Sequence, residues 1–247
     1  MRYLTGDCRK MSNIIVRSLF WNNVSREIVE AQKSVYDKLR IKLHQDNLDQ
    51  ANHGAWMDAV VAKSNDDDIV IFSDIDAFPL SKEAFDHAIN CALNGAVFGL
   101  AQTANHTSNA RMVYAGPMFL AFKKSTWKKA GSPSFLPNSS CDAAQALSVN
   151  AVQNGIKVNL LLPTACLEPK WPLANLGLFG LGTFYENQFF HLFESRSSKS
   201  IELFKAVADD VVFGRSLQYG DYLGIIEAHL KIIPRDSFFG RILKCWR

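Results

Sequence analysis

The sequence predicts an α/β fold in which a mostly parallel central sheet is flanked by helices. Short apolar runs rich in β-branched residues alternate with segments of helical periodicity along the first hundred residues. In addition, residues 69–72 read Ile-Val-Ile-Phe and are apolar at every position. Such a run is typical of a strand that is covered on both faces in a parallel sheet. We therefore expect residues 69–72 to form a central strand.

The chain begins with a β-α-β pattern. After an apolar run, Ser25 is a suitable N-cap, and Ile28 and Val35 recur on one face of the helix that follows. Right-handed crossovers of this kind build parallel sheets. The expected strands cover residues 13–20, 41–44, 69–72, 95–100, 114–122, 157–162 and 184–193. The expected helices cover residues 25–39, 52–61, 81–93, 123–129 and 141–154, followed by a helical segment from residue 201. Residues 102–111, 131–140 and 163–182 are expected to be irregular.

The composition is that of a globular protein with material for one large core. The chain has 247 residues, of which 48% are hydrophobic and 21% charged. Its net charge of +3 comes without a block of Lys and Arg, so nucleic acid is not expected as a partner. The five cysteines form no Cys-x-x-Cys pair, which indicates neither a zinc site nor a disulfide framework. With no apparent signal peptide or membrane span, we expect a cytoplasmic protein.

Two carboxylates follow the expected central strand. Asp74 and Asp76 are spaced two residues apart, and Pro79 should help to end the strand. In an extended segment, residues with this spacing point to the same side, so both carboxylates could enter one crevice at the end of the strand. Mg²⁺ and Mn²⁺ take carboxylate oxygens and are commonly shared with nucleotide phosphates. The alternative interpretation is a pair of acids that solvate a turn.

The strand followed by Asp74-Ile75-Asp76 resembles the Asp-x-Asp motif of nucleotide-sugar glycosyltransferases with the GT-A fold. This resemblance extends over about residues 13–196. It implies a Rossmann-like GT-A domain over residues 1–196. The residue pattern after this domain predicts a helical C-terminal segment with a basic amphipathic tail over residues 197–247. The resemblance also implies metal-dependent transfer of a sugar from a UDP-, GDP- or dTDP-linked donor to a hydroxyl of a growing glycan or lipid-linked saccharide, as in polysaccharide biosynthesis.

The resemblance also assigns site residues. It implies that Mn²⁺ or Mg²⁺ is bound by Asp74, Asp76 and the late histidine His191. Asp142 would be the catalytic base if the enzyme inverts, although the Glu-Asp pair of many inverting members is lacking here. The expected contacts to the nucleotide sugar are His53, Asp58, Asp74, Ile75 and Gly116. Structural alternatives stay open: a core histidine for His191, a helix-capping acid for Asp142, and capping or loop-fixing roles for His53 and Asp58.

Two other classes of function are compatible with paired carboxylates after a strand. A nucleotidyltransferase or phosphohydrolase is less well supported, because a Gly-x-x-x-x-Gly-Lys loop and His-Asp clusters are missing. A non-catalytic module that binds nucleotide or carbohydrate is also an open alternative.

The C-terminal tail has an amphipathic pattern. Residues 238–247 alternate aromatic and aliphatic side chains with Arg241, Lys244 and Arg247. Such a tail could make peripheral contact with an anionic membrane, or it could pack on the domain.

Overall fold

The computed structural model describes residues 13–104 and 112–232, and within them a central sheet of six strands. The strand order is β2-β1-β3-β6-β5-β7, and β6 alone runs antiparallel to its neighbours. The α/β class and the mostly parallel central sheet are therefore confirmed. The strands of this sheet are β1 (Ile14–Phe20), β2 (Leu43–Asn47), β3 (Ile69–Ser73), β5 (Val97–Thr103), β6 (Val113–Lys123) and β7 (Val158–Leu161).

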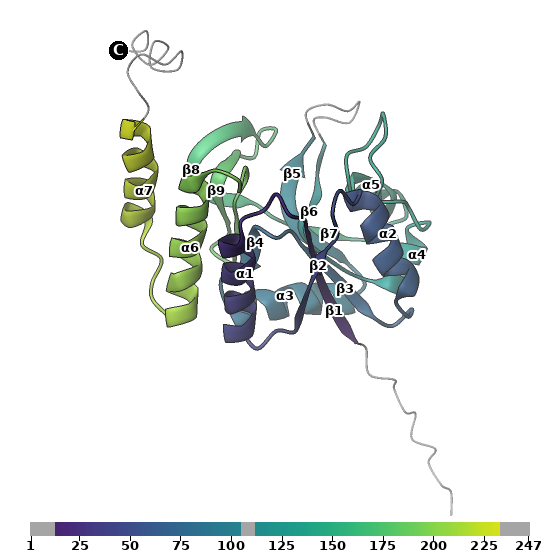
Figure 1. Ribbon diagram of the computed structural model, residues 1–247. Coiled ribbons are helices and arrows are strands. Elements are labelled where there is room, and N and C mark those ends of the chain that lie inside the picture. Colours follow the sequence, from purple (N-terminus) through teal and green to yellow (C-terminus); the bar gives the residue numbers. More distant parts are fainter. Residues whose placement is uncertain (1–12, 105–111, 233–247) are drawn as a thin grey trace, which may run out of the picture.

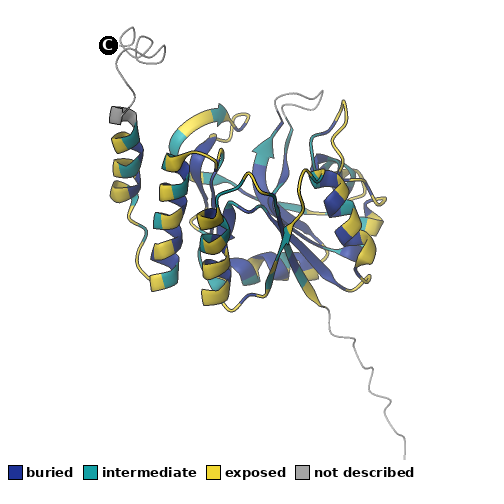
Figure 2. Ribbon diagram, in the orientation of Figure 1, coloured by how far each residue is buried: buried dark blue, intermediate teal, exposed yellow. Residues whose placement is uncertain are grey.

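Strand β3 separates two hydrophobic clusters, and every one of its residues is buried. Ile69 and Ile71 face the larger cluster, whereas Val70 and Phe72 face the other one, as the alternation of side chains along a strand requires. Helices α1 (Arg26–Lys38) and α3 (Lys82–Leu93) contribute to the first cluster. Helices α2 (His53–Lys63), α4 (Lys124–Lys129) and α5 (Gln145–Gln153) cover the second (Figure 1). Figure 2 shows the resulting buried sheet between helices with exposed outer faces.

A second sheet of four strands was not expected. Its order is β4 (Ala77–Pro79), β10 (Phe189–His191), β9 (Leu178–Tyr185) and β8 (Pro163–Pro172). The expectation that residues 163–182 are irregular was therefore wrong. The prolines are tolerated because β8 lies at the edge of the sheet and its register shifts near Pro163 and Pro169. Gly180 is required there, because a Cβ would come within 2.3 Å of the Glu168 carbonyl oxygen.

Several expected boundaries were also wrong. Strand β2 begins at Leu43 rather than residue 41, and α5 begins at Gln145 rather than residue 141 because Ala144 adopts a left-handed conformation (φ 64°). Pro79 does not end the central strand. It is the last residue of β4, since β3 already ends at Ser73. Most of the expected loop 102–111 lies outside the described residues.

The described part of the C-terminal segment contains two helices, α6 (Ser198–Phe213) and α7 (Tyr219–Ile232). Helix α6 packs beside α1 (Figure 1), and its Phe204 contacts Phe78 with ring centroids 5.0 Å apart. The division between residues 196 and 197 stays a prediction, although α6 shares the main hydrophobic cluster. The amphipathic tail lies outside the described residues. In the part of the chain that the structure describes, no helix has the length and apolarity needed to cross a membrane.

Candidate functional site

The Asp74–Asp76 segment forms a turn between the two sheets. Strand β3 ends at Ser73, the N–H of Ala77 donates to the carbonyl oxygen of Asp74 over 3.0 Å, and β4 then begins in the second sheet. The N–H of Asp74 donates to the Met118 carbonyl oxygen on β6 over 2.9 Å. Both carboxylates line one cavity, as expected, but the cause differs. The turn directs them there, rather than the alternation of an extended strand.

Strand pairing brings His191 to this turn. On β10, His191 pairs with Ala77, and the N–H of Leu192 donates to the Asp76 carbonyl oxygen over 2.9 Å. Potential ligand atoms of Asp74, Asp76 and His191 all lie within 4.8 Å of one another. The structure thus places His191 beside two carboxylates that precede it by more than a hundred positions in the sequence.

The His191 ring is buried, and its two nitrogens differ in their surroundings. Nε2 lies 3.4 Å from Asp76 Oδ1, whereas Nδ1 has no hydrogen-bond partner among the described residues. The ring also contacts Phe193, with centroids 4.1 Å apart, so part of the core-histidine interpretation holds. A buried ring nitrogen without a partner is costly in a purely structural histidine.

The donor set fits a hard divalent cation. Burial raises the pKa of the Asp74 carboxyl above its usual range; the His53 and His191 charges oppose this effect, and the neighbouring Asp76 adds to it. Two part-buried carboxylates this close together disfavour each other's charged form, and a cation between them would remove that penalty. Carboxylates with one imidazole suit Mn²⁺, and the carboxylates also suit Mg²⁺. We therefore consider the three residues a candidate metal centre.

Asp74 and Asp76 of the candidate metal centre line a cavity of about 220 Å³. The residues that line it come from the end of β1, the start of α2, the Asp74–Asp76 turn and the segment after β10. They are Leu19, Phe20, Trp21, Asn23, Val24, His53, Asp74, Ile75, Asp76, Ser195 and Arg196. His53 Nε2 lies 3.4 Å from Asp74 Oδ1, and the His53 ring stacks on Trp56. His53 and Ile75 thus line the cavity, and their contacts with a nucleotide sugar stay predictions.

Sequence reasoning missed Trp21 and Arg196. Trp21 is half-buried directly after β1, and Arg196 is exposed after β10. Among the described residues, Arg196 has no carboxylate partner, so its guanidinium is available to an anionic ligand. The position of Trp21 after the first strand could have indicated its role, because ligands of open α/β sheets bind outside the carboxyl ends of the strands. The sequence around Arg196 gave no such signal, because Arg196 reaches the cavity only through the pairing of β10 in the second sheet.

Asp142 lies just before α5 instead of within the helix. The Tyr114 hydroxyl donates to Asp142 Oδ2 over 3.0 Å, and the Asp142 N–H donates to Gln145 Oε1 over 2.8 Å. Burial raises the pKa of the Tyr114 phenol, and the negative charges of Asp142 and Asp74 raise it further. Tyr114 lies in the part of β6 that extends past the carboxyl end of β3, so its hydrogen bond to Asp142 places Asp142 toward the same end of the sheet as the candidate metal centre. Its catalytic role stays a prediction.

Asp58 and Gly116 do not line the cavity next to the metal centre. Asp58 accepts hydrogen bonds from Ser134 Oγ over 2.6 Å and from the Phe135 N–H over 3.1 Å, so it fixes the loop after α4. At Gly116, a Cβ would come within 2.4 Å of Met118 Sδ, so internal packing accounts for the glycine. Contacts of these two residues with a nucleotide sugar stay predictions that the geometry does not favour.

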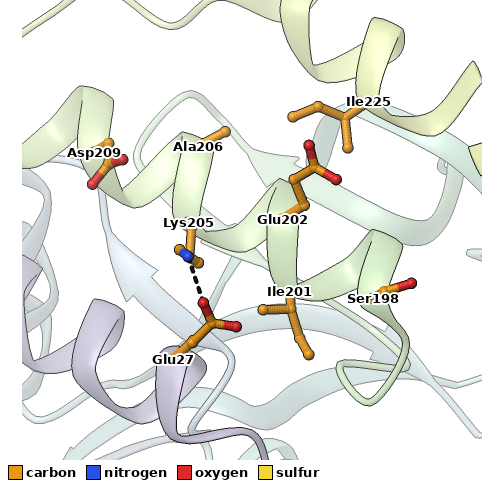
Figure 3. Close-up of a pocket in the computed structure, with 8 residues that line it drawn as sticks. All are labelled: Glu27, Ser198, Ile201, Glu202, Lys205, Ala206, Asp209 and Ile225. Carbon is orange, nitrogen blue, oxygen red and sulfur yellow. Dashed lines mark hydrogen bonds and ion pairs between the residues drawn. The ribbon is translucent and has the colours of Figure 1, made fainter. Parts of the chain in front are cut away.

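A larger cavity of about 460 Å³ lies between α1, α6 and α7 (Figure 3). Lys205 on α6 pairs with Glu27 on α1 over 2.6 Å, and the other charged side chains that line the cavity are Glu202 and Asp209. Glu202 pairs with His229 over 2.9 Å. These pairs link helices at the surface, and the cavity holds no combination of groups that indicates chemistry.

Comparison with known proteins gives structural similarity alone. No family model and no curated protein matches the sequence. Among solved structures, a mannosyltransferase from Pyrobaculum calidifontis, in complex with GDP-Man and Mn²⁺, is 11% identical with a TM-score of 0.45 and aligns over 90% of this chain and 70% of its own. The catalytic domain of Drosophila β1,4-galactosyltransferase 7, in complex with xylobiose, is 12% identical with a TM-score of 0.40, over 68% and 70%.

A 4-diphosphocytidyl-2C-methyl-D-erythritol synthase from Anaerococcus prevotii is similar to the same degree. It is 11% identical with a TM-score of 0.45, over 80% of this chain and 99% of its own. Glycosyltransferases, the class that the sequence resembles, are thus among the similar structures. At these identities and TM-scores, the ligands and reactions of those proteins do not transfer to this chain, and its activity has to follow from its own side chains.

Proposed function

We propose that this protein is a metal-dependent glycosyltransferase that moves a sugar from a nucleotide-diphosphate sugar to a hydroxyl acceptor. One observation supports it above the others: Asp74 and Asp76 line one cavity beside the end of β1 together with Arg196, which has no carboxylate partner among the described residues. A cation site beside a free guanidinium suits a diphosphate, because both offer positive charge to phosphate oxygens. The half-buried Trp21 offers an apolar ring to the base or the sugar.

Each residue of the candidate site has a separate role in this proposal. Asp74, Asp76 and His191 would hold Mn²⁺ or Mg²⁺, which would supply positive charge to the diphosphate leaving group. Arg196 donates to phosphate oxygens and adds to this neutralisation. His53, beside Asp74, keeps that carboxylate oriented. If the reaction inverts, Asp142 accepts the proton of the acceptor hydroxyl.

The partners follow from this assignment as parts of the same proposal. The donor is a UDP-, GDP- or dTDP-linked sugar, and the acceptor is a growing glycan or a lipid-linked saccharide in the cytoplasm. A lipid-linked acceptor would agree with peripheral membrane contact through the basic tail.

A thermal-shift panel tests the proposal. We expect nucleoside diphosphates and one class of nucleotide sugar to raise the melting temperature only when Mn²⁺ or Mg²⁺ is present, because ligands stabilise the state they bind. Asp76→Asn should abolish this rise. Asp58→Asn is the matched control, because it makes the same change at a part-buried carboxylate that lies outside the cavity, and it should retain the rise.

Product analysis then separates the classes of enzyme. A glycosyltransferase releases a nucleoside diphosphate from the sugar donor. Release of pyrophosphate from a nucleoside triphosphate would instead show a nucleotidyltransferase. Metal-supported binding without any turnover would show a binding module, and either result would overturn the proposed activity.

A further inference from the structure

A buried glutamine lies behind the turn that carries Asp74 and Asp76. Gln32 on α1 has no exposed surface. Its Nε2 donates to the carbonyl oxygen of Asp74 over 2.6 Å and to that of Ala77 over 2.9 Å. Its Oε1 accepts a hydrogen bond from Gln45 Nε2 over 3.0 Å. A buried amide is costly unless its polar atoms are paired, and here each of them has a partner.

The two carbonyl groups that Gln32 binds belong to the first residue of the turn and to the residue that follows it. The N–H of Ala77 closes the turn by donating to the same Asp74 carbonyl. One side chain therefore fixes both ends of the segment from which the two carboxylates project. This contact spans more than forty positions in the sequence, so it reflects the packing of α1 against the sheet.

Neighbouring side chains hold the glutamine in this position. Gln45 on β2 also donates to the Val29 carbonyl oxygen on α1 over 2.9 Å, which fixes the amide that binds Gln32. One turn further along α1, the Tyr36 hydroxyl donates to Ser73 Oγ over 2.8 Å. Ser73 Oγ in turn donates to the Ala77 carbonyl over 3.1 Å. The Ala77 carbonyl oxygen therefore has a second side-chain donor. At the Asp74 carbonyl oxygen, the Gln32 amide is the nearest side-chain donor, and Ser73 Oγ lies farther away.

We propose that Gln32 is a positioning residue of the metal centre. The inference depends on the proposed function, because it assumes that Asp74 and Asp76 bind a divalent cation. Without the ion, two neighbouring carboxylates repel each other and favour a turn that has opened outward. Gln32 opposes this opening, so the ligands are already in place when the ion arrives. Preorganisation of this kind lowers the entropy cost of ordering the ligands when the ion binds.

The test compares Gln32→Met with Tyr36→Phe. Methionine has nearly the same length as glutamine but cannot donate to the Asp74 and Ala77 carbonyls. Tyr36→Phe removes a buried hydrogen bond on the same helix and leaves the Gln32 contacts intact. Isothermal titration with Mn²⁺ measures metal affinity, and thermal unfolding of the metal-free protein measures stability. We expect both variants to melt earlier, but only Gln32→Met to bind Mn²⁺ about 10-fold or more weakly, as loss of an outer-shell partner does.

Equal loss of stability with wild-type Mn²⁺ affinity in both variants would show that Gln32 is only structural, and would overturn the inference while the metal centre stands. If wild-type protein binds no more Mn²⁺ than Asp76→Asn, the metal centre itself falls, and the inference falls with it. Should Gln32→Met fail to fold, Gln45→Leu replaces it, since Gln45 is only half-buried. A several-fold weaker Mn²⁺ affinity in Gln45→Leu supports the inference, and unchanged affinity overturns it.

Discussion

Replacing His191 by leucine should separate metal binding from stability. Leucine retains most of the volume of the buried ring, whereas alanine would leave a cavity beside Phe193. The replacement removes Nδ1, a buried atom without a partner among the described residues, and such an atom costs about 1–3 kcal/mol. It also removes the contact of Nε2 with Asp76, worth about 0.5–1.5 kcal/mol. The free energy of unfolding without metal should therefore be unchanged or about 1 kcal/mol higher.

The effect on metal binding should be in the opposite direction. Loss of one ligand should lower the affinity for Mn²⁺ at least as much as loss of an outer-shell partner does, which is about 10–100-fold. At saturating Mn²⁺ this reduces the metal-dependent stabilisation by about 1.4–2.7 kcal/mol. With about 2–4 °C per kcal/mol for a chain of this size, the Mn²⁺-induced rise in melting temperature should be smaller by about 3–11 °C.

Thermal unfolding with and without Mn²⁺ measures both quantities. Phe189→Leu is a matched control, because Phe189 lies on the same strand and packs against Phe119 with ring centroids 4.4 Å apart. We expect the control to lower the melting temperature of the metal-free protein and to keep the full Mn²⁺-induced rise. If His191→Leu behaves like this control, His191 is a core histidine and the reasoning is refuted.

Three further predictions concern the ligand, the acceptor and the tail. Arg196→Gln should weaken binding of nucleoside diphosphate about 10–100-fold, since hydrogen bonds to charged groups contribute about 1.5–3 kcal/mol, while Mn²⁺ affinity measured by titration stays the same. Equal loss of both affinities would contradict a phosphate contact. Asp142→Asn should lower the rate of an inverting transfer by about 10²–10⁴-fold without changing donor binding, and an unchanged rate would exclude it as the base. Full-length protein should float with anionic liposomes more than a chain ending near Pro234 does, and equal flotation of the two would remove the proposed membrane contact.

The sequence by itself determined the central strand and the chemistry at its end. Four consecutive apolar residues before Asp74 require a strand that is buried on both faces, and the carboxylates that follow have to leave the core at its edge. The N-cap Ser25 likewise depends on a local contact, because its side chain accepts a hydrogen bond from the N–H of Glu27, two residues away. Local signals of this kind survive in a single sequence.

Only the tertiary structure decided which distant residues complete the site. His191 reaches Asp76 because β10 pairs with β4, and Arg196 lies in the same cavity because the chain turns back after that pairing. Gln32 supports the turn because α1 packs across the sheet. The prolines and glycines of residues 163–182 indicate a loop locally, but edge position and register shifts accommodate them in a strand. Strand pairing and helix docking bring these residues together in space. The spacing of the residues along the chain does not predict such contacts.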